Sequence, residues 1–201
     1  MTTTISAPPQ REASRAKRLK AQTHEVHEGV DRSIMSAASF ASLERYERFL
    51  AVQYLFHHDI AVLYEDARLQ ALFPDLAARQ RLHLVAADLT DLKLDPPQTT
   101  APVFVPGDAV DIPTALGWLY VAEGSNMGAA LLRKEAAKIG LSDNYGARHL
   151  APAQEGPAPH WRAFTAALDS VTLDETEEGR VVDGAIAAFA RVQDHVDARL
   201  G

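Results

Sequence analysis

Glycines inside an apolar, helix-length run are the first residues whose spacing suggests chemistry. The run reads Gly117-Trp-Leu-Tyr-Val-Ala-Glu-Gly-Ser-Asn-Met-Gly-Ala-Ala-Leu-Leu132, with glycine at 117, 124 and 128. Each glycine costs a helix about 1 kcal/mol relative to alanine, and a Gly-Ser pair such as Gly124-Ser125 is a typical kink site. At 3.6 residues per turn, Tyr120 and the three glycines fall near one stripe, so backbone would line that face. The pattern predicts a bent helix that a planar ligand can approach closely, and the alternative is a seam of small residues against which another helix packs.

Histidines are the second group of candidates, because the chain has eight of them and no cysteine. Without thiolates, a metal or haem-iron ligand would be a histidine, a carboxylate, a methionine or a tyrosine. His24 and His27 are three residues apart on a predicted helix, which is a weak chelating pattern. The sequence motifs typical of zinc, calcium, di-iron, hydrolase and nucleotide sites are absent. The histidines alone therefore leave a metal role open.

These residues must be positioned by helices, since no segment alternates with the period of a strand. Ser42 predicts a helix start as an N-cap, Pro113 suits a first helical turn, and Gly140 predicts a helix end. The sequence Thr172-Leu-Asp-Glu175 has the form of a capping box. The predicted helices are 13–35, 43–64, 75–92, 113–139, 141–150, 161–168 and 172–200, with loops over 95–107 and 151–159.

Length and composition predict one globular unit. The chain has 201 residues, of which 47% are hydrophobic, so we expect a single domain over 11–201. Residues 1–10 are rich in Thr and Pro and show no periodicity, so we expect a disordered tail there. A net charge of −7 argues against nucleic acid as the main partner, although a basic strip is present. The strip consists of Arg11, Arg15, Lys17, Arg18 and Lys20. No apolar run reaches the roughly 20 residues of a membrane span, and with no cysteine we expect a cytoplasmic location and no membrane partner.

Four segments, in order, resemble those of bacterial haem oxygenases of the iron-acquisition or phytochrome-associated branch. They read Leu19-Lys-Ala-Gln-Thr-His-Glu-Val-His-Glu-Gly-Val-Asp31, Phe49-Leu-Ala-Val-Gln-Tyr-Leu-Phe-His-His-Asp59, Gly117-Trp-Leu-Tyr-Val-Ala-Glu-Gly-Ser-Asn-Met-Gly128 and Asn144-Tyr-Gly-Ala-Arg-His-Leu150. The resemblance extends from about Leu19 to Phe189 and implies an all-α, haem-oxygenase-like bundle. In such a bundle, haem b lies between a proximal helix and a kinked distal helix.

The resemblance also implies the central site residues. His27 matches the proximal iron ligand, and its second ring nitrogen needs an acceptor such as Glu28 or a backbone carbonyl. Gly124, Ser125 and Gly128 match the catalytic distal stretch, where a bare backbone leaves room for O₂ over the porphyrin edge. No distal histidine is implied. Hydroxylation of a meso carbon is therefore expected instead of peroxidase-like O–O cleavage.

Supporting roles follow from the same resemblance, each beside a simpler alternative. Lys20 lies two helical turns before His27 and would meet a haem propionate, or is an exposed lysine. Tyr120 would pack on the haem edge or anchor a water network, and Phe189 would contact the macrocycle or belong to the core. Family members that cleave away from the α position share an Asn and a Lys where this chain has Lys20 and Met35. We therefore expect α cleavage.

The implied reaction takes haem, O₂ and external electrons and releases biliverdin, Fe²⁺ and CO. Since the chain has no flavin or nicotinamide motif, the electrons would come from a ferredoxin, a ferredoxin reductase or a flavoprotein. A haem-delivery protein and a bilin acceptor are further candidate partners. Two alternatives stay open at this point: a non-catalytic haem carrier or sensor that uses the His27 pocket, and a helical interaction module that binds no haem.

Overall fold

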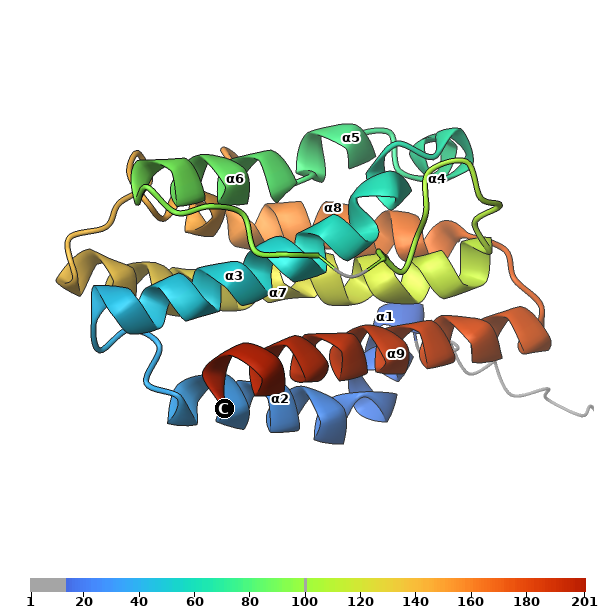
Figure 1. Cartoon of the computed structure of the whole chain (residues 1–201). Coiled ribbons are helices and arrows are strands. Elements are labelled where there is room, and N and C mark those ends of the chain that lie inside the picture. Colours follow the sequence, from blue (N-terminus) through green and yellow to red (C-terminus); the bar gives the residue numbers. More distant parts are fainter. Residues whose placement is uncertain (1–13, 100) are drawn as a thin grey trace, which may run out of the picture.

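The computed structural model describes residues 14–99 and 101–201, where every regular element is a helix (Figure 1). The tail predicted over residues 1–10 and Arg11 of the basic strip lie outside the described residues. The elements are α1 Arg15–Gln22, α2 His24–Ser36, α3 Leu43–Ile60, η1 Ala61–Tyr64, α4 Ala67–Leu72, α5 Leu76–Arg79, α6 Leu82–Asp91, α7 Ile112–Lys138, η2 Arg148–Leu150, α8 Pro157–Ser170 and α9 Glu175–Leu200. The all-α prediction is confirmed. None of the helices in the described ranges is long and apolar enough to cross a membrane.

Helix α9 organises the bundle, because α7, α3 and α2 all pack against it (Figure 1). It begins at a capping box, although two residues later than the sequence predicts. Asp174 is the N-cap, and its side chain accepts from the backbone of Glu177 while the Glu177 side chain accepts from the Asp174 backbone. The most extensive contact between two helices of the bundle joins α9 to α7, the helix that carries the three glycines.

Gly117 and Gly184 allow α7 and α9 to touch through their backbones. A Cβ atom on Gly117 would lie 2.5 Å from the backbone nitrogen of Ala185 and closer still to the carbonyl oxygen of Val181. A Cβ atom on Gly184 would overlap the carbonyl oxygen of Thr114. The prediction that all three glycines of α7 line a ligand face is therefore wrong at Gly117, where the missing side chain serves helix packing.

Some helix boundaries also differ from the predictions. The predicted helix 13–35 is divided at Thr23, which has helix-breaking dihedrals of φ −105° and ψ 5° and donates its hydroxyl to the Leu19 carbonyl. The predicted helix 75–92 is divided into α5 and α6, and α8 begins at Pro157, earlier than expected. Local side-chain bonds of this kind compete with helix continuation without changing the hydrophobic pattern.

Two short helices were assigned incorrectly. The structure has α4 after the N-cap Asp66, where no helix was predicted. It also replaces the predicted helix 141–150 with a turn in which Ser142 and Tyr145 exchange backbone bonds, followed by the single turn η2. Gly146 in this turn has φ +70°, a conformation that favours glycine and ends a helix. The starts of α3 at Ser42 and of α7 near Pro113 agree with the predictions.

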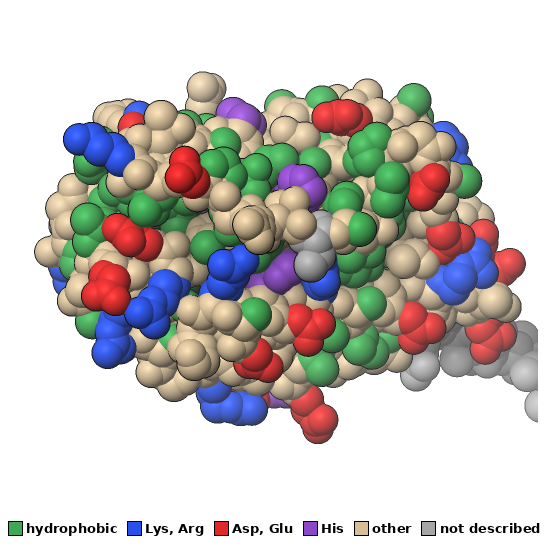
Figure 2. Space-filling model, in the orientation of Figure 1, with side chains coloured by type: hydrophobic (Ala, Val, Ile, Leu, Met, Phe, Trp, Pro, Cys, Tyr) green, Lys and Arg blue, Asp and Glu red, His purple; other side chains and the backbone are tan. Residues whose placement is uncertain are grey.

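Charged side chains of both signs are interspersed over the face of the molecule that Figure 2 shows. Neutral and apolar side chains separate them there. This face therefore offers no extended surface of one charge, which is what binding a nucleic acid backbone would require.

Candidate functional site

The His27 imidazole lies on α2 against a ring of α9. Its centroid is 5.1 Å from that of Phe189, and the two planes are tilted by 30°. The His27 side chain is 55% exposed, and its Nε2 lies 3.4 Å from a carboxylate oxygen of Asp31. Phe189, by contrast, is only 9% exposed. The structure thus brings together two of the predicted site residues from opposite ends of the chain.

The carboxylate beside His27 is not the expected one. Glu28 lies 3.3 Å from Nε2 of His24 and 3.7 Å from Arg32, so it is engaged one helical turn to either side. Side chains at i and i+4 meet on a helix, which pairs His24 with Glu28 and His27 with Asp31. Glu28 is therefore engaged with other side chains, for reasons of helical register, and a backbone carbonyl stays the predicted acceptor for the second nitrogen of His27.

The distal candidates lie in the middle of α7, which continues through them without interruption. The Ser125 hydroxyl donates to the Ala122 carbonyl at 2.7 Å. A Cβ atom on Gly128 would meet nothing within 4 Å, and one on Gly124 would meet only the ring of Trp161, at 3.6 Å. This stretch of α7 therefore has open space over its backbone, while the bend at Gly124-Ser125 stays a prediction.

Exposed apolar side chains accompany the open backbone. At 100° per residue, Leu131 falls on the same stripe as Gly124 and Gly128. Leu131 is 57% exposed and Met127 is 43% exposed. Large apolar side chains at this level of exposure, grouped on one helix face, are typical of a surface that a ligand or partner covers.

The two remaining predicted residues occupy different environments. Tyr120 is buried, with its ring centroid 5.6 Å from that of Trp161, and burial raises its pKa so that the hydroxyl stays protonated. Lys20 is exposed on α1. Because the helix is divided at Thr23, the argument that Lys20 and His27 share one helix face no longer holds, and a propionate contact of Lys20 rests on the resemblance alone.

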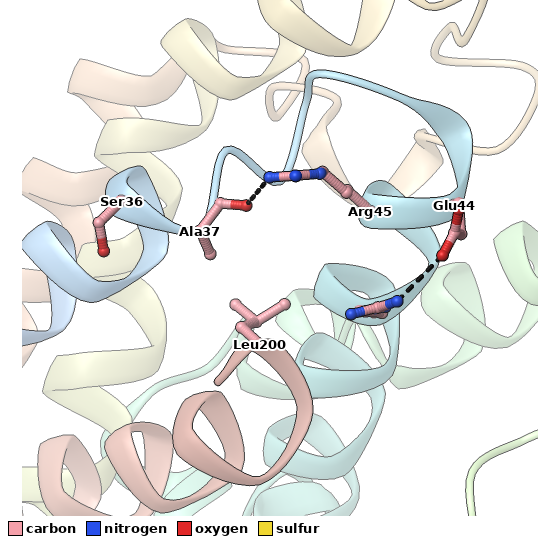
Figure 3. Close-up of a pocket in the computed structure, with 6 residues that line it drawn as sticks. Ser36, Ala37, Glu44, Arg45 and Leu200 are labelled. Atoms are coloured by element: carbon pink, nitrogen blue, oxygen red, sulfur yellow. Dashed lines mark hydrogen bonds and ion pairs between the residues drawn. The ribbon is translucent and has the colours of Figure 1, made fainter.

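One cavity of the described residues lies away from His27 and the distal glycines. It has a volume of about 390 Å³ and is bounded by the α2–α3 turn, the first turns of α3 and the end of α9 (Figure 3). Its cations already have partners, since Arg45 donates to the Ala37 carbonyl and Arg48 pairs with Glu44. None of the predicted site residues lines it. The cavity therefore adds nothing to the candidate site.

Comparisons with known proteins identify the family of this chain. A family model described as heme oxygenase matches residues 107–198. A protein named Heme oxygenase PigA, from Pseudomonas aeruginosa, is 41% identical over 95% of this chain and 96% of its own length.

The chain belongs to the heme oxygenase family.

Solved structures show the same relationship. The NO- and CO-bound heme oxygenase of Neisseria meningitidis is 40% identical, matches with a TM-score of 0.87, and is covered over 92% of its length and 94% of this chain. Heme oxygenase from Leptospira interrogans is 18% identical, with a TM-score of 0.67 over 92% of this chain and all of that one, and so supports the fold alone. Members of the family cleave haem oxidatively. Haem is their substrate and cofactor, and O₂ and an external reductant are consumed.

The residues of the site fit a haem in this family. His27 presents an accessible imidazole, as an iron ligand must. Helix α7, the expected distal helix, offers glycine backbone and exposed apolar side chains, which suit the face of a macrocycle. Both helices contact α9, α2 through the His27–Phe189 rings and α7 through Gly117 and Gly184.

The matched motif at 144–150 has a structural role. Asp88, fully buried on α6, accepts from the backbone nitrogens of Arg148 and His149 and from the His149 ring at 2.8 Å. The Arg148 guanidinium pairs with Asp91. These bonds attach η2 to α6, so the structure gives Arg148 and His149 a role in holding these two elements together.

A buried histidine on α3 lies beside this cluster. His57 is 5% exposed, its Nδ1 has no hydrogen-bond partner, and burial together with the charges of His149 and Arg81 lowers its pKa to about 3. The imidazole is therefore neutral in the folded protein at any pH near neutrality. The residue types alone gave no indication of this burial, because His57 and His58 are adjacent and chemically identical.

We expect His57 to make the protein less stable in acid. Its pKa is lower folded than unfolded, so the unfolded chain binds more protons, and stability falls as pH decreases below about 6.5. Between pH 7 and pH 5 the loss from this residue is about 2 kcal/mol in the free energy of unfolding. Urea titrations at both pH values give the loss in free energy of unfolding for wild type and for His57→Leu, and the loss in wild type should be larger by this amount. A His58→Leu variant should keep the wild-type dependence, and an equal dependence in His57→Leu would contradict the assignment.

Proposed function

We propose that this chain cleaves haem at the α-meso carbon, with His27 as the iron ligand and Gly124, Ser125 and Gly128 facing the other side of the macrocycle. One observation supports this arrangement above the others. Helix α9 contacts the His27 ring through Phe189 and the distal helix through Gly184, so a single element sets both walls.

His27 contributes a neutral imidazole nitrogen. The Asp31 carboxylate near its Nε2 is 64% exposed, so it can turn away into water without a desolvation cost. Phe189 restricts the rotation of the ring from one side. The imidazole therefore needs little rearrangement to accept iron.

The distal residues act mainly by leaving space. Bound haem supplies the iron that takes up O₂ and electrons. Gly124 and Gly128 offer no side chain that could donate a proton, and the Ser125 hydroxyl is already committed to the Ala122 carbonyl. Proton delivery through ordered water follows from this, and attack on the porphyrin edge is favoured over an acid-assisted O–O cleavage.

The electron donor is proposed to be a ferredoxin-type or flavoprotein partner that docks near α1. Arg15 and Arg18 of the basic strip pair with Glu178, whereas Lys17 and Lys20 are exposed. Two exposed lysines near the proximal helix suit an acidic partner at low ionic strength. A haem-delivery protein, a bilin acceptor and the cytoplasmic location stay predictions.

Reconstitution with haem tests the proposal. With ascorbate or a reductase present, the Soret band should disappear and biliverdin should form, and chromatography should identify the α isomer. A stable Soret band with no biliverdin would favour the haem carrier, and no haem binding at all would favour the interaction module. A different bilin isomer would contradict the α assignment while leaving haem cleavage intact.

We expect Gly128→Ala to separate stability from activity. A methyl group there meets nothing within 4 Å, so improved helix propensity should raise the free energy of unfolding of the haem-free protein by about 0.5 to 1 kcal/mol. The same methyl group occupies space over the haem and should slow biliverdin formation roughly tenfold. Thermal melts and single-turnover assays measure the two effects. Gly179→Ala, in open space on α9, should gain similar stability with unchanged turnover.

A further inference from the structure

A carboxylate directly before the distal glycines is completely enclosed. The Glu123 side chain is 1% exposed, and it follows Ala122 and precedes Gly124 on α7. Burying an ion costs several kcal/mol unless it is paired and hydrogen-bonded, so a glutamate at this position needs specific partners.

The partners come from three other elements. Arg79 of α5 donates to one Glu123 oxygen at 2.9 Å, and Tyr64 of η1 donates to the other at 3.2 Å. His160 of α8 lies 3.5 Å from the first oxygen, and its other ring nitrogen is 2.6 Å from Glu155. Two hydrogen bonds and the nearby His160 ring, which approach from three directions, restrain both the rotation and the sliding of α7 at this residue.

Arg79 is itself fixed. It is 2% exposed, pairs with Asp75, donates to the His160 carbonyl, and lies 5.8 Å over the ring of Phe164. Because its guanidinium is planar and bonded on several sides, it cannot follow a displaced carboxylate. Arg79 also lies 3.0 Å from Nε2 of His160, so its guanidinium contacts both residues, and the carboxylates of Glu123 and Glu155 raise the pKa of His160.

Helix α8 also contacts the distal stretch directly. Trp161, the neighbour of His160, is the side chain closest to the space over Gly124, and its ring packs against Tyr120. Two consecutive residues of α8 therefore hold two consecutive residues of α7, one through charge and one through packing.

We propose that Glu123 is a positioning residue, whose clamp with Tyr64, Arg79 and His160 fixes the backbone of Gly124 to Gly128 relative to the rest of the bundle. This inference rests on the proposed function, in which that backbone faces the haem. The carboxylate acts through the helix and does not touch the substrate.

Amide hydrogen exchange in the haem-free protein tests the clamp. In Glu123→Gln, exchange of the amides of residues 124–130 should accelerate at least about tenfold, while the amides of α9 keep their wild-type rates. Tyr64→Phe removes one hydrogen bond and leaves the ion pair, so its effect should be smaller and in the same place. If Glu123→Gln does not fold, the local effect in Tyr64→Phe decides the question.

A matched control is available at Asp59. It is a buried carboxylate on α3 with the same partner types, since Arg191 donates at 2.7 Å and His195 lies at 2.9 Å, both on α9. Asp59→Asn should accelerate exchange in α9 and leave residues 124–130 protected. Equal acceleration throughout the molecule in both variants would overturn the proposal, and so would unchanged exchange at 124–130 in Glu123→Gln and Tyr64→Phe.

The haem-loaded protein provides the second readout. Glu123→Gln should keep the haem Kd within about threefold of wild type, because His27 is unchanged, while biliverdin forms roughly tenfold more slowly or as a mixture of isomers. Wild-type product from a variant with accelerated local exchange would overturn the positioning role. Since exchange is measured without haem, a wild type that forms no biliverdin would refute the proposed function and leave the clamp measurement intact.

Discussion

His27→Ala is expected to reduce biliverdin formation by about a hundredfold or more, because it removes the imidazole that is proposed to bind the iron. Haem should still associate with the apolar surface, but its ferric and ferrous absorption spectra should lose the features of imidazole ligation. Single-turnover assays with ascorbate and absorption spectra in both oxidation states measure the two effects.

The control lies one helical turn away. His24 is exposed and pairs with Glu28, so His24→Ala should leave the spectrum and turnover unchanged. Added imidazole should restore part of the spectrum of His27→Ala, since the side chain lost is an imidazole with an exposed edge. A His27→Ala protein whose spectra equal those of wild type would show that the iron ligand lies elsewhere.

Gly117→Ala is expected to destabilise the fold by about 3 kcal/mol or more. The added methyl group meets backbone atoms of Val181 and Ala185, which cannot change rotamer to make room. The helices α7 and α9 would have to separate, and the core between them would loosen. Urea unfolding of the haem-free protein measures the loss.

The matched variant on the same helix is Gly128→Ala, which is expected to gain stability. Opposite signs in the two variants would show that local crowding, and not helix propensity, determines the effect at Gly117. Equal small gains in both would mean that α7 and α9 are less closely packed than the structure shows.

The helical class and the main helices follow from sequence because local signals agree there. Ser42, Pro113 and Gly140 mark helix boundaries through their own backbone chemistry, and the structure has α3 and α7 at those positions. The division at Thr23 was missed because a threonine hydroxyl that bonds its own turn leaves the hydrophobic spacing unchanged.

The site was predictable only in part, for a related reason. His27, Gly124 and Gly128 belong to contiguous motifs that the resemblance identified. The clamp around Glu123 joins residues that are far apart in the chain, such as Tyr64 and His160, and a lone glutamate in a helix gives no sign of its partners. Gly117 resembles Gly128 in the sequence, yet only the docking of α9 gives it a different role.

The dependence of both walls on α9 has a consequence for the order of synthesis. On the ribosome, α2 and α7 are made before α9, so the two walls exist for a time without the element that sets their separation. Domains fold as units once their last required segment has emerged. The two walls are therefore expected to assume their spacing only once Phe189 has left the ribosomal exit tunnel, and nascent chains arrested with Phe189 still inside the tunnel should not retain haem.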